Sequence, residues 1–159
     1  MKKIISFTLS ILILFAYLLS DAIAVDKTGS SVTKPRTGST RPFGSGSITN
    51  RSDGSSSTTR SFGSGSTTVE RDKYGKSVTG DTRKFGSSTI TKWSDGSSTE
   101  VRPFGSGSTM TNRDKNGRVT TTGDTRQFGN GTTTKFSNGA TSTTRPFGSG
   151  STTTDRPKK

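Results

Sequence analysis

A four-residue motif, Arg-x-Phe-Gly, recurs six times along the chain and constrains its fold more than any other feature. The phenylalanines are separated by 19, 23, 19, 24 and 19 residues, so short and long units alternate. Regular spacing of this size is typical of arrays in which one supersecondary unit is repeated. The motif begins at Arg41, Arg60, Arg83, Arg102, Arg126 and Arg145, and its aromatic residues are Phe43, Phe62, Phe85, Phe104, Phe128 and Phe147.

The first 24 residues have the three parts of a secretory signal peptide. Two lysines precede an apolar run at residues 4–19, and Ala22 and Ala24 form a small-x-small cleavage site before Val25. The run of roughly 16 residues is shorter than the ~20 that span a bilayer, although an uncleaved anchor is the alternative. We therefore expect a secreted or cell-surface protein, extracellular or periplasmic according to the organism, with no transmembrane segment after cleavage.

The predicted mature chain has too few apolar residues for an ordinary globular core. Only 19 of its 135 residues are Ala, Val, Ile, Leu, Met, Phe, Trp or Tyr, whereas 53 are Ser or Thr. Ordering each residue costs about 1–2 kcal/mol, which so few apolar side chains cannot offset by burial. The composition therefore indicates either a thin core repeated many times or substantial disorder.

The chain is strongly basic, with a formal net charge of +13, or +12 without the signal peptide. Such a charge attracts anionic polymers and surfaces. The predicted partners are anionic polysaccharide, an anionic surface or nucleic acid, and self-association is a further possibility.

Each short unit has a turn dipeptide at its centre, flanked by Ser, Thr and Ile. These dipeptides suit a type I′ turn between two antiparallel strands, and β-branched residues favour strands. Alternation along residues 89–94 places Thr89, Thr91 and Trp93 on one face of the first strand. The predicted turns are Asp53-Gly54, Asp95-Gly96 and Asn138-Gly139.

The long units carry a wider turn, with Asp72 and Gly75 in one and Asp114 and Gly117 in the other. Aspartate at the first position and glycine at the fourth suit a type I turn that ends in a left-handed glycine. Residues 113–120 resemble the core of the tyrosine-aspartate repeats of large secreted bacterial proteins, in which Asp-x-x-Gly-Arg forms a hairpin turn. The resemblance implies a hairpin here and no particular activity.

These signals predict an all-β fold of tandem hairpins, arranged as a meander or solenoid with a thin core, with substantial disorder as the alternative. We divide the chain into a signal peptide (residues 1–24), a flexible basic leader (25–40) and the repeats (41–159). The last unit stops where its turn would begin, which suits either an array that stacks on something else or a frayed terminus.

The sequence predicts no enzyme, metal site or cofactor. It has no histidine or cysteine, which excludes the Ser-His-Asp and Cys-His types of catalytic centre. Six of the aspartates recur at equivalent turn positions in successive units, which indicates a structural role. They are Asp53, Asp72, Asp81, Asp95, Asp114 and Asp124.

The repeated Arg-x-Phe-Gly motif has two interpretations. In the structural one, which we favour for phenylalanine, each ring stacks on the ring of the next unit and glycine allows a sharp corner. In the functional one, arginine and phenylalanine together bind an anionic polymer. The motif arginines are candidates for polyanion binding under either interpretation.

For function, these features predict a secreted, non-enzymatic repeat protein with a structural or adhesive role at a cell surface or in a matrix. Such a protein would bind anionic polymers or assemble with itself. The alternative is a soluble cationic effector or antimicrobial factor that binds anionic envelopes or nucleic acid. Ice binding through threonine rows such as residues 132–134 is a weaker alternative.

Overall fold

The computed structural model describes residues 35–158, which form twelve β-strands joined by short loops. The predicted signal peptide, with its cleavage site at Ala22, Ala24 and Val25, lies outside the described residues. No helix within these residues is long and apolar enough to cross a membrane. The strands are β1 (Arg36–Phe43), β2 (Gly46–Arg51), β3 (Ser56–Phe62), β4 (Gly65–Arg71), β5 (Ser77–Phe85), β6 (Ser88–Trp93), β7 (Ser98–Phe104), β8 (Gly107–Arg113), β9 (Val119–Phe128), β10 (Gly131–Phe136), β11 (Thr141–Phe147) and β12 (Gly150–Arg156).

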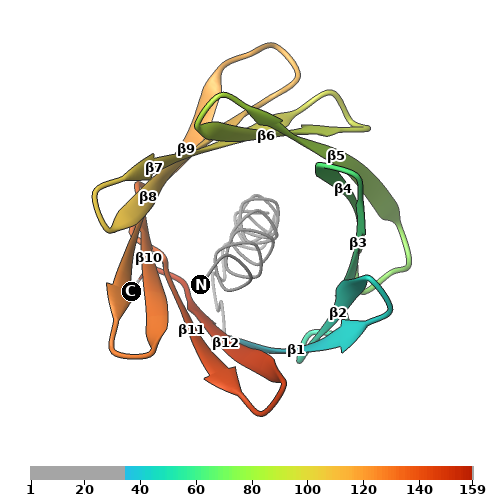
Figure 1. Cartoon of the computed structure of the whole chain (residues 1–159), viewed down its shortest axis with the longest axis vertical. Helices are drawn as coiled ribbons and strands as arrows, with labels where there is room; N and C mark the ends of the chain where they lie inside the picture. The colour runs from blue at the N-terminus through green and yellow to red at the C-terminus, as the bar shows by residue number, and fades with distance from the viewer. Residues whose placement is uncertain (1–34, 159) are drawn as a thin grey trace, which may run out of the picture.

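Each strand pairs antiparallel with the strands before and after it in the sequence, and β12 pairs with β1. The result is a closed barrel, in which the strands follow one another around a ring from β1 to β12 (Figure 1). The all-β hairpin meander predicted from the repeats is therefore confirmed, whereas the open, solenoid-like arrangement is not. Twist and strand tilt allow a long meander to close on itself, which removes both of its edges.

The first and last strands of the repeat array pair with each other. Strand β1 begins at Arg36, so the prediction of a flexible leader up to residue 40 is wrong for its last five residues. These residues pair with β12 in register, from Arg36 opposite Asp155 to Thr40 opposite Ser151. Strand β1, at the start of the array, therefore pairs with β12 of the last unit, which looks incomplete in the sequence.

Six tight turns lie at one end of the barrel, which we call the Phe-Gly end. In each, the phenylalanine of the motif is the last residue of an odd-numbered strand, and two residues such as Gly44-Ser45 make the turn. Gly44 has a φ of 56°, and positive φ angles in the described chain occur only at glycines. Positive φ at the first central residue alone is the pattern of a type II′ turn, which matches the twist of paired strands.

The opposite, wide-loop end holds the predicted turn residues. In the short-unit loops the amide of Gly54 donates to the carbonyl of Arg51 (3.0 Å), and the same bond recurs at Gly96 and Gly139. Only the glycine has positive φ, so the predicted type I′ turn, which needs two such residues, is not formed. A type I turn followed by a left-handed glycine forms instead, because aspartate prefers to accept hydrogen bonds from the following amides.

The long-unit loops have the geometry expected from their sequence. Asp72 accepts hydrogen bonds from the amides of Tyr74 and Lys76, both at 2.9 Å. Asp114 does the same for the amides of Asn116 and Arg118, which forms the hairpin turn that the tyrosine-aspartate resemblance implies. These two aspartates therefore stabilise the backbone conformation of their loops.

The interior of the barrel is built mainly from threonine. In five of the six hairpins that turn at the Phe-Gly end, two inward threonines nine residues apart join their hydroxyl groups across the strand pair. In the remaining hairpin Val101 and Met110 face each other at this level. The threonine pairs are Thr40 with Thr49, Thr59 with Thr68, Thr82 with Thr91, Thr125 with Thr134, and Thr144 with Thr153, at oxygen–oxygen distances of 2.8–3.0 Å.

Large apolar side chains gather on one side of this interior. Trp93, Val101, Met110 and Phe136, on strands β6, β7, β8 and β10, are all buried. Trp93 packs across the strand pair over Gly80, where a Cβ atom would lie 2.7 Å from the indole ring. Glycine is thus required opposite the tryptophan, because any side chain would occupy the place of the ring.

We expect Gly80→Ala to destabilise the barrel by about 1–3 kcal/mol, the usual cost of overpacking. Gly38→Ala is the matched control, because a Cβ there meets only ordinary contacts at 3.5 Å from Arg51 and Thr49. Urea unfolding followed by the fluorescence of Trp93, the single tryptophan, measures both variants. Equal midpoints for the two variants would contradict the proposed packing.

Candidate functional site

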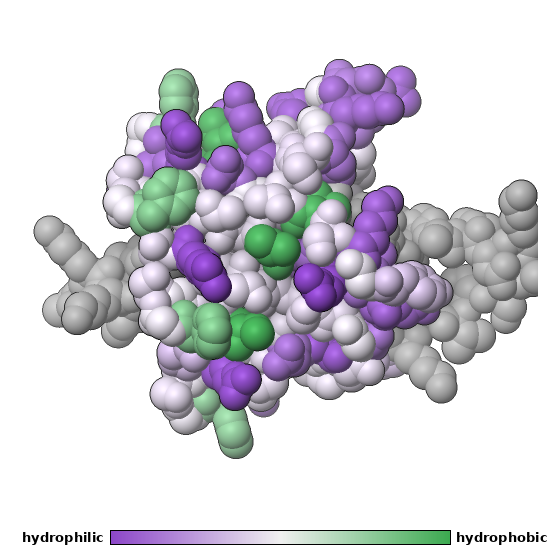
Figure 2. Space-filling model, turned by 90° about the vertical axis from the view of Figure 1, so that its right-hand side faces the viewer, coloured by the Kyte–Doolittle hydropathy of each residue, from purple (hydrophilic) through white to green (hydrophobic). Residues whose placement is uncertain are grey.

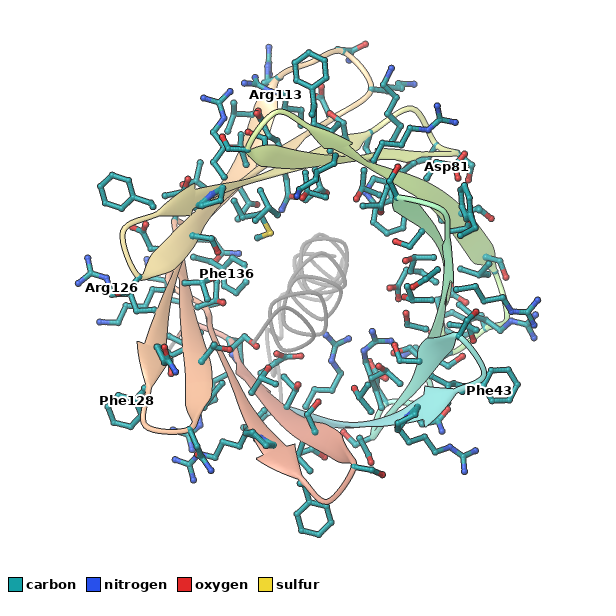
Figure 3. All side chains as sticks on the ribbon, in the orientation of Figure 1. Phe43, Asp81, Arg113, Arg126, Phe128 and Phe136 are labelled. Atoms are coloured by element: carbon teal, nitrogen blue, oxygen red, sulfur yellow. The ribbon has the colours of Figure 1, made fainter. Side chains whose placement is uncertain are left out.

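The motif arginines form a ring around the outside of the barrel. All six are exposed and lie at the same level of successive odd-numbered strands. In each strand the motif phenylalanine follows two residues later, on the same outer face and closer to the Phe-Gly end. We call these twelve residues the arginine–phenylalanine belt; Figure 3 shows Arg126, Phe128 and Phe43 directed away from the interior.

The phenylalanine rings of the belt are exposed, by 49% at Phe43 and up to 75% at Phe147. The strands that carry them are separated by one other strand, so neighbouring rings start about 9.6 Å apart. The favoured interpretation, in which each ring stacks on the next as an aromatic ladder, therefore does not fit the barrel. Each ring instead stands opposite a small residue of its own hairpin, such as Gly46 for Phe43.

Carboxylates divide the belt into two halves. On β5, β7 and β9, an acidic residue lies two positions before the arginine on the same outer face; on β11, β1 and β3 that position holds Thr143, Ser39 and Thr58. Glu100 shows the effect, because it accepts a hydrogen bond of 2.7 Å from Arg102. Asp81 and Asp124 also stand opposite Lys92 and Lys135 on the neighbouring strands, so the halves differ in whether a carboxylate lies beside each arginine rather than in their excess of positive charge. The acidic residues are Asp81, Glu100 and Asp124.

Asp81 and Asp124 differ from the other recurring aspartates. The sequence-based grouping placed all six at turns, but these two lie inside strands β5 and β9. Asp81 accepts a hydrogen bond from Thr67 on the neighbouring strand (3.1 Å). Among residues 35–158, no three acidic side chains come together as they would to hold a metal ion.

A second set of residues, inside the barrel, distinguishes one hairpin from another. The eighth residue after each motif phenylalanine points inward, next to the level of the threonine pairs. A small residue, Gly, Ser or Thr, stands opposite it in every hairpin. We call this the inner variable position, and its occupants are Arg51, Glu70, Trp93, Asn112, Phe136 and Asp155.

Charged occupants of the inner variable position are neighbours on β12, β2 and β4. Arg51 lies 3.4 Å from Glu70, and their side chains are only 2% and 5% exposed. Next to them Arg36 bridges Asp155 (2.9 Å) and Asp53 (3.1 Å). A polar network therefore occupies one wall of the interior, away from the apolar group at Trp93 and Phe136.

Burial dominates the protonation of this network. Burial raises the pKa of Glu70 to about 7, although the nearby Arg51 guanidinium acts to lower it. Burial also raises the pKa of Asp155 against the opposing effect of Arg36. Asp53 behaves differently, because burial acts to raise its pKa but hydrogen bonds from Ser55 and Arg36 lower it overall.

Polar side chains also join the aromatic wall. The indole Nε1 of Trp93 donates to Thr99 (3.1 Å), whose hydroxyl donates to Asn112 (2.9 Å). This relay links three strands at the level of the inner variable position. It satisfies the indole N–H, as a buried tryptophan requires.

The sequence analysis named the belt arginines as candidates for polyanion binding, which remains a prediction, and it missed the inner variable position. The sequence does contain a signal for this position. When the units are aligned on phenylalanine, the eighth residue after it changes chemical class in nearly every unit. The residue two positions earlier is threonine in five units and methionine in the sixth. That Arg51, Glu70 and Asp155 meet Arg36 in one network has no such signal, because these residues come from opposite ends of the chain.

We expect the free energy of unfolding to fall as pH rises from about 4 to 8, by at most roughly 3 kcal/mol from Glu70. The folded state binds the Glu70 proton more tightly than the unfolded state, since its pKa is raised from 4.5 to about 7. This stabilisation is complete below the unfolded value and is lost as pH passes the folded value.

Urea unfolding across this pH range measures the effect. Glu70→Gln removes the ionisable group and flattens the pH dependence, whereas Glu100→Gln, at a residue facing outward beside Arg102, leaves it unchanged. An unaltered slope in the Glu70→Gln variant would show that the buried pair does not titrate as described.

No protein family, no functionally characterised protein and no solved structure matches this chain.

Proposed function

We propose that this protein is a secreted, non-enzymatic adhesive barrel that binds anionic polymers at a cell surface or in a matrix. The proposal rests on one observation: six exposed arginines encircle the barrel at a single level. A ring of this kind offers one cationic group about every 9.6 Å to a polymer that follows the circumference. Many weak contacts held by one rigid frame give strong binding, because each further contact is made at a high effective concentration.

Electrostatic asymmetry of the belt indicates where such a polymer binds. Arg41, Arg60 and Arg145 have uncharged neighbours at the preceding outward position, whereas Arg83, Arg102 and Arg126 follow a carboxylate. A polyanion meets no competing carboxylate beside the first group, whereas in the second it competes with Glu100 for Arg102 and meets two carboxylates that also face Lys92 and Lys135. The expected contact region runs across β11, β12 and β1 to β3.

Three variants with the same change in charge test the proposal. We expect replacement of Arg41, Arg60 and Arg145 by Gln to weaken heparin binding by roughly tenfold to a hundredfold, at about 1 kcal/mol or less per arginine. The corresponding variant at Arg83, Arg102 and Arg126 should lose less. The measurement is the dissociation constant at several salt concentrations, and the slope against salt should become shallower in the first variant.

A third triple variant controls for net charge. It replaces exposed cations near the wide-loop end, namely Arg71, Arg118 and Arg156, by Gln. Binding should change little in this variant. A loss as large as that of the first variant would mean that overall charge, and not the belt, governs binding.

A further inference from the structure

We propose that the belt also binds an anionic lipid surface, which the barrel meets with its Phe-Gly end. The inference rests on the proposed function, because it assigns a partner to the same arginines. Its separate basis is the placement of the six phenylalanines relative to those arginines. All six rings are exposed and stand at the last strand position before the tight turns.

The two residue types lie at different heights on the barrel. Each phenylalanine is two residues closer to the Phe-Gly end than its arginine, a step of about 6.6–6.8 Å along the strand. A bilayer has the same order of chemistry along its normal, with phosphate groups outside and apolar chains inside. When this end faces the membrane, the rings enter the headgroup region while the guanidinium groups remain level with the phosphates.

Exposed phenylalanine distinguishes this partner from a soluble polyanion. A sulfated polysaccharide pairs with the arginines but gains little from six apolar rings, five of which are at least half exposed. Figure 2 shows one side of the barrel, where hydrophobic side chains form separate patches between strongly hydrophilic ones. This alternation suits a mixed apolar and anionic surface.

Charge also argues against a second copy of the chain as the partner at this end. Two Phe-Gly ends brought together would oppose two rings of arginine, which repel each other. The next level along the wall carries Asp81 and Asp124, which stand opposite Lys92 and Lys135, and Glu100, which accepts a hydrogen bond from Arg102. The carboxylates at this level favour membrane contact at the Phe-Gly end itself over contact further along the wall.

Vesicle binding by the whole protein tests the inference. The probes are phosphatidylcholine vesicles with and without phosphatidylserine, and heparin serves as the reference ligand. The key variant replaces Phe43, Phe62 and Phe147 by Ser, and its fold is checked by circular dichroism and Trp93 fluorescence. We expect binding only to the anionic vesicles, about tenfold or more weaker in this variant, with heparin binding unchanged.

The result separates the two proposals. Unchanged vesicle binding in the phenylalanine variant overturns the lipid inference and leaves heparin binding by the arginines intact. Failure of the unaltered protein to bind either heparin or vesicles overturns both. Phenylalanine-dependent binding to single-stranded DNA without binding to vesicles overturns the lipid inference in favour of a nucleic acid.

Fluorescence of a tryptophan placed at the Phe-Gly end tests membrane contact without the triple variant. Phe43→Trp in a Trp93→Phe background places the single indole at the Phe-Gly end. We expect its emission to shift to shorter wavelength with anionic vesicles and to be quenched by lipids brominated in their acyl chains. Emission that stays the same at saturating anionic lipid would overturn the inference.

Discussion

Backbone hydrogen bonding around a closed ring is the interaction on which this structure depends. Buried hydrophobic residues within the described chain number five, namely Trp93, Val101, Met110, Phe136 and Ala140. A sheet with free edges and so thin a core would be marginal and prone to pair with other chains. Pairing of β1 with β12 gives every strand two partners, so backbone donors and acceptors that edge strands would leave unpaired are satisfied. The threonine pairs then join five of the six hairpins internally through hydroxyl groups that would otherwise be buried without a partner.

The hairpins could be predicted from the sequence, but their closure could not. Asp-Gly and Asn-Gly dipeptides, and the aspartate and glycine of the longer loops, act within four or five residues, so local chemistry decides them. Closure joins Arg36 to Asp155, which are 119 residues apart, and depends on the number and tilt of all the strands together. The type of short-unit turn was also mistaken, because the same Asp-Gly dipeptide suits both a type I′ turn and a type I turn followed by a left-handed glycine.

Phenylalanine was misplaced for a physical reason. In a chain with so few apolar residues, the repeated ring is the obvious candidate for a core, and burial would ordinarily be its favoured state. Here threonine takes that role, since it is β-branched, small and able to pair its hydroxyl across the strands. The exposure of the arginines could be predicted more directly, because a charge repeated in every unit has few alternatives to the surface. Which arginines have a carboxylate beside them became clear once the strands and their outward faces were known.

Because the ring must close, the barrel contains a whole number of hairpins. A hairpin can be gained or lost by duplication or deletion, but the gain or loss of a single strand would make the two closing strands run parallel and would break the antiparallel pairing seen between β1 and β12. Each added hairpin brings one arginine and one phenylalanine to the belt at an unchanged spacing between strands, while the curvature of the barrel wall decreases. The number of arginines and phenylalanines that such a barrel presents is therefore set by the number of repeat copies in its gene. The size of this outer surface can therefore change in steps without any change to the residues of a single repeat.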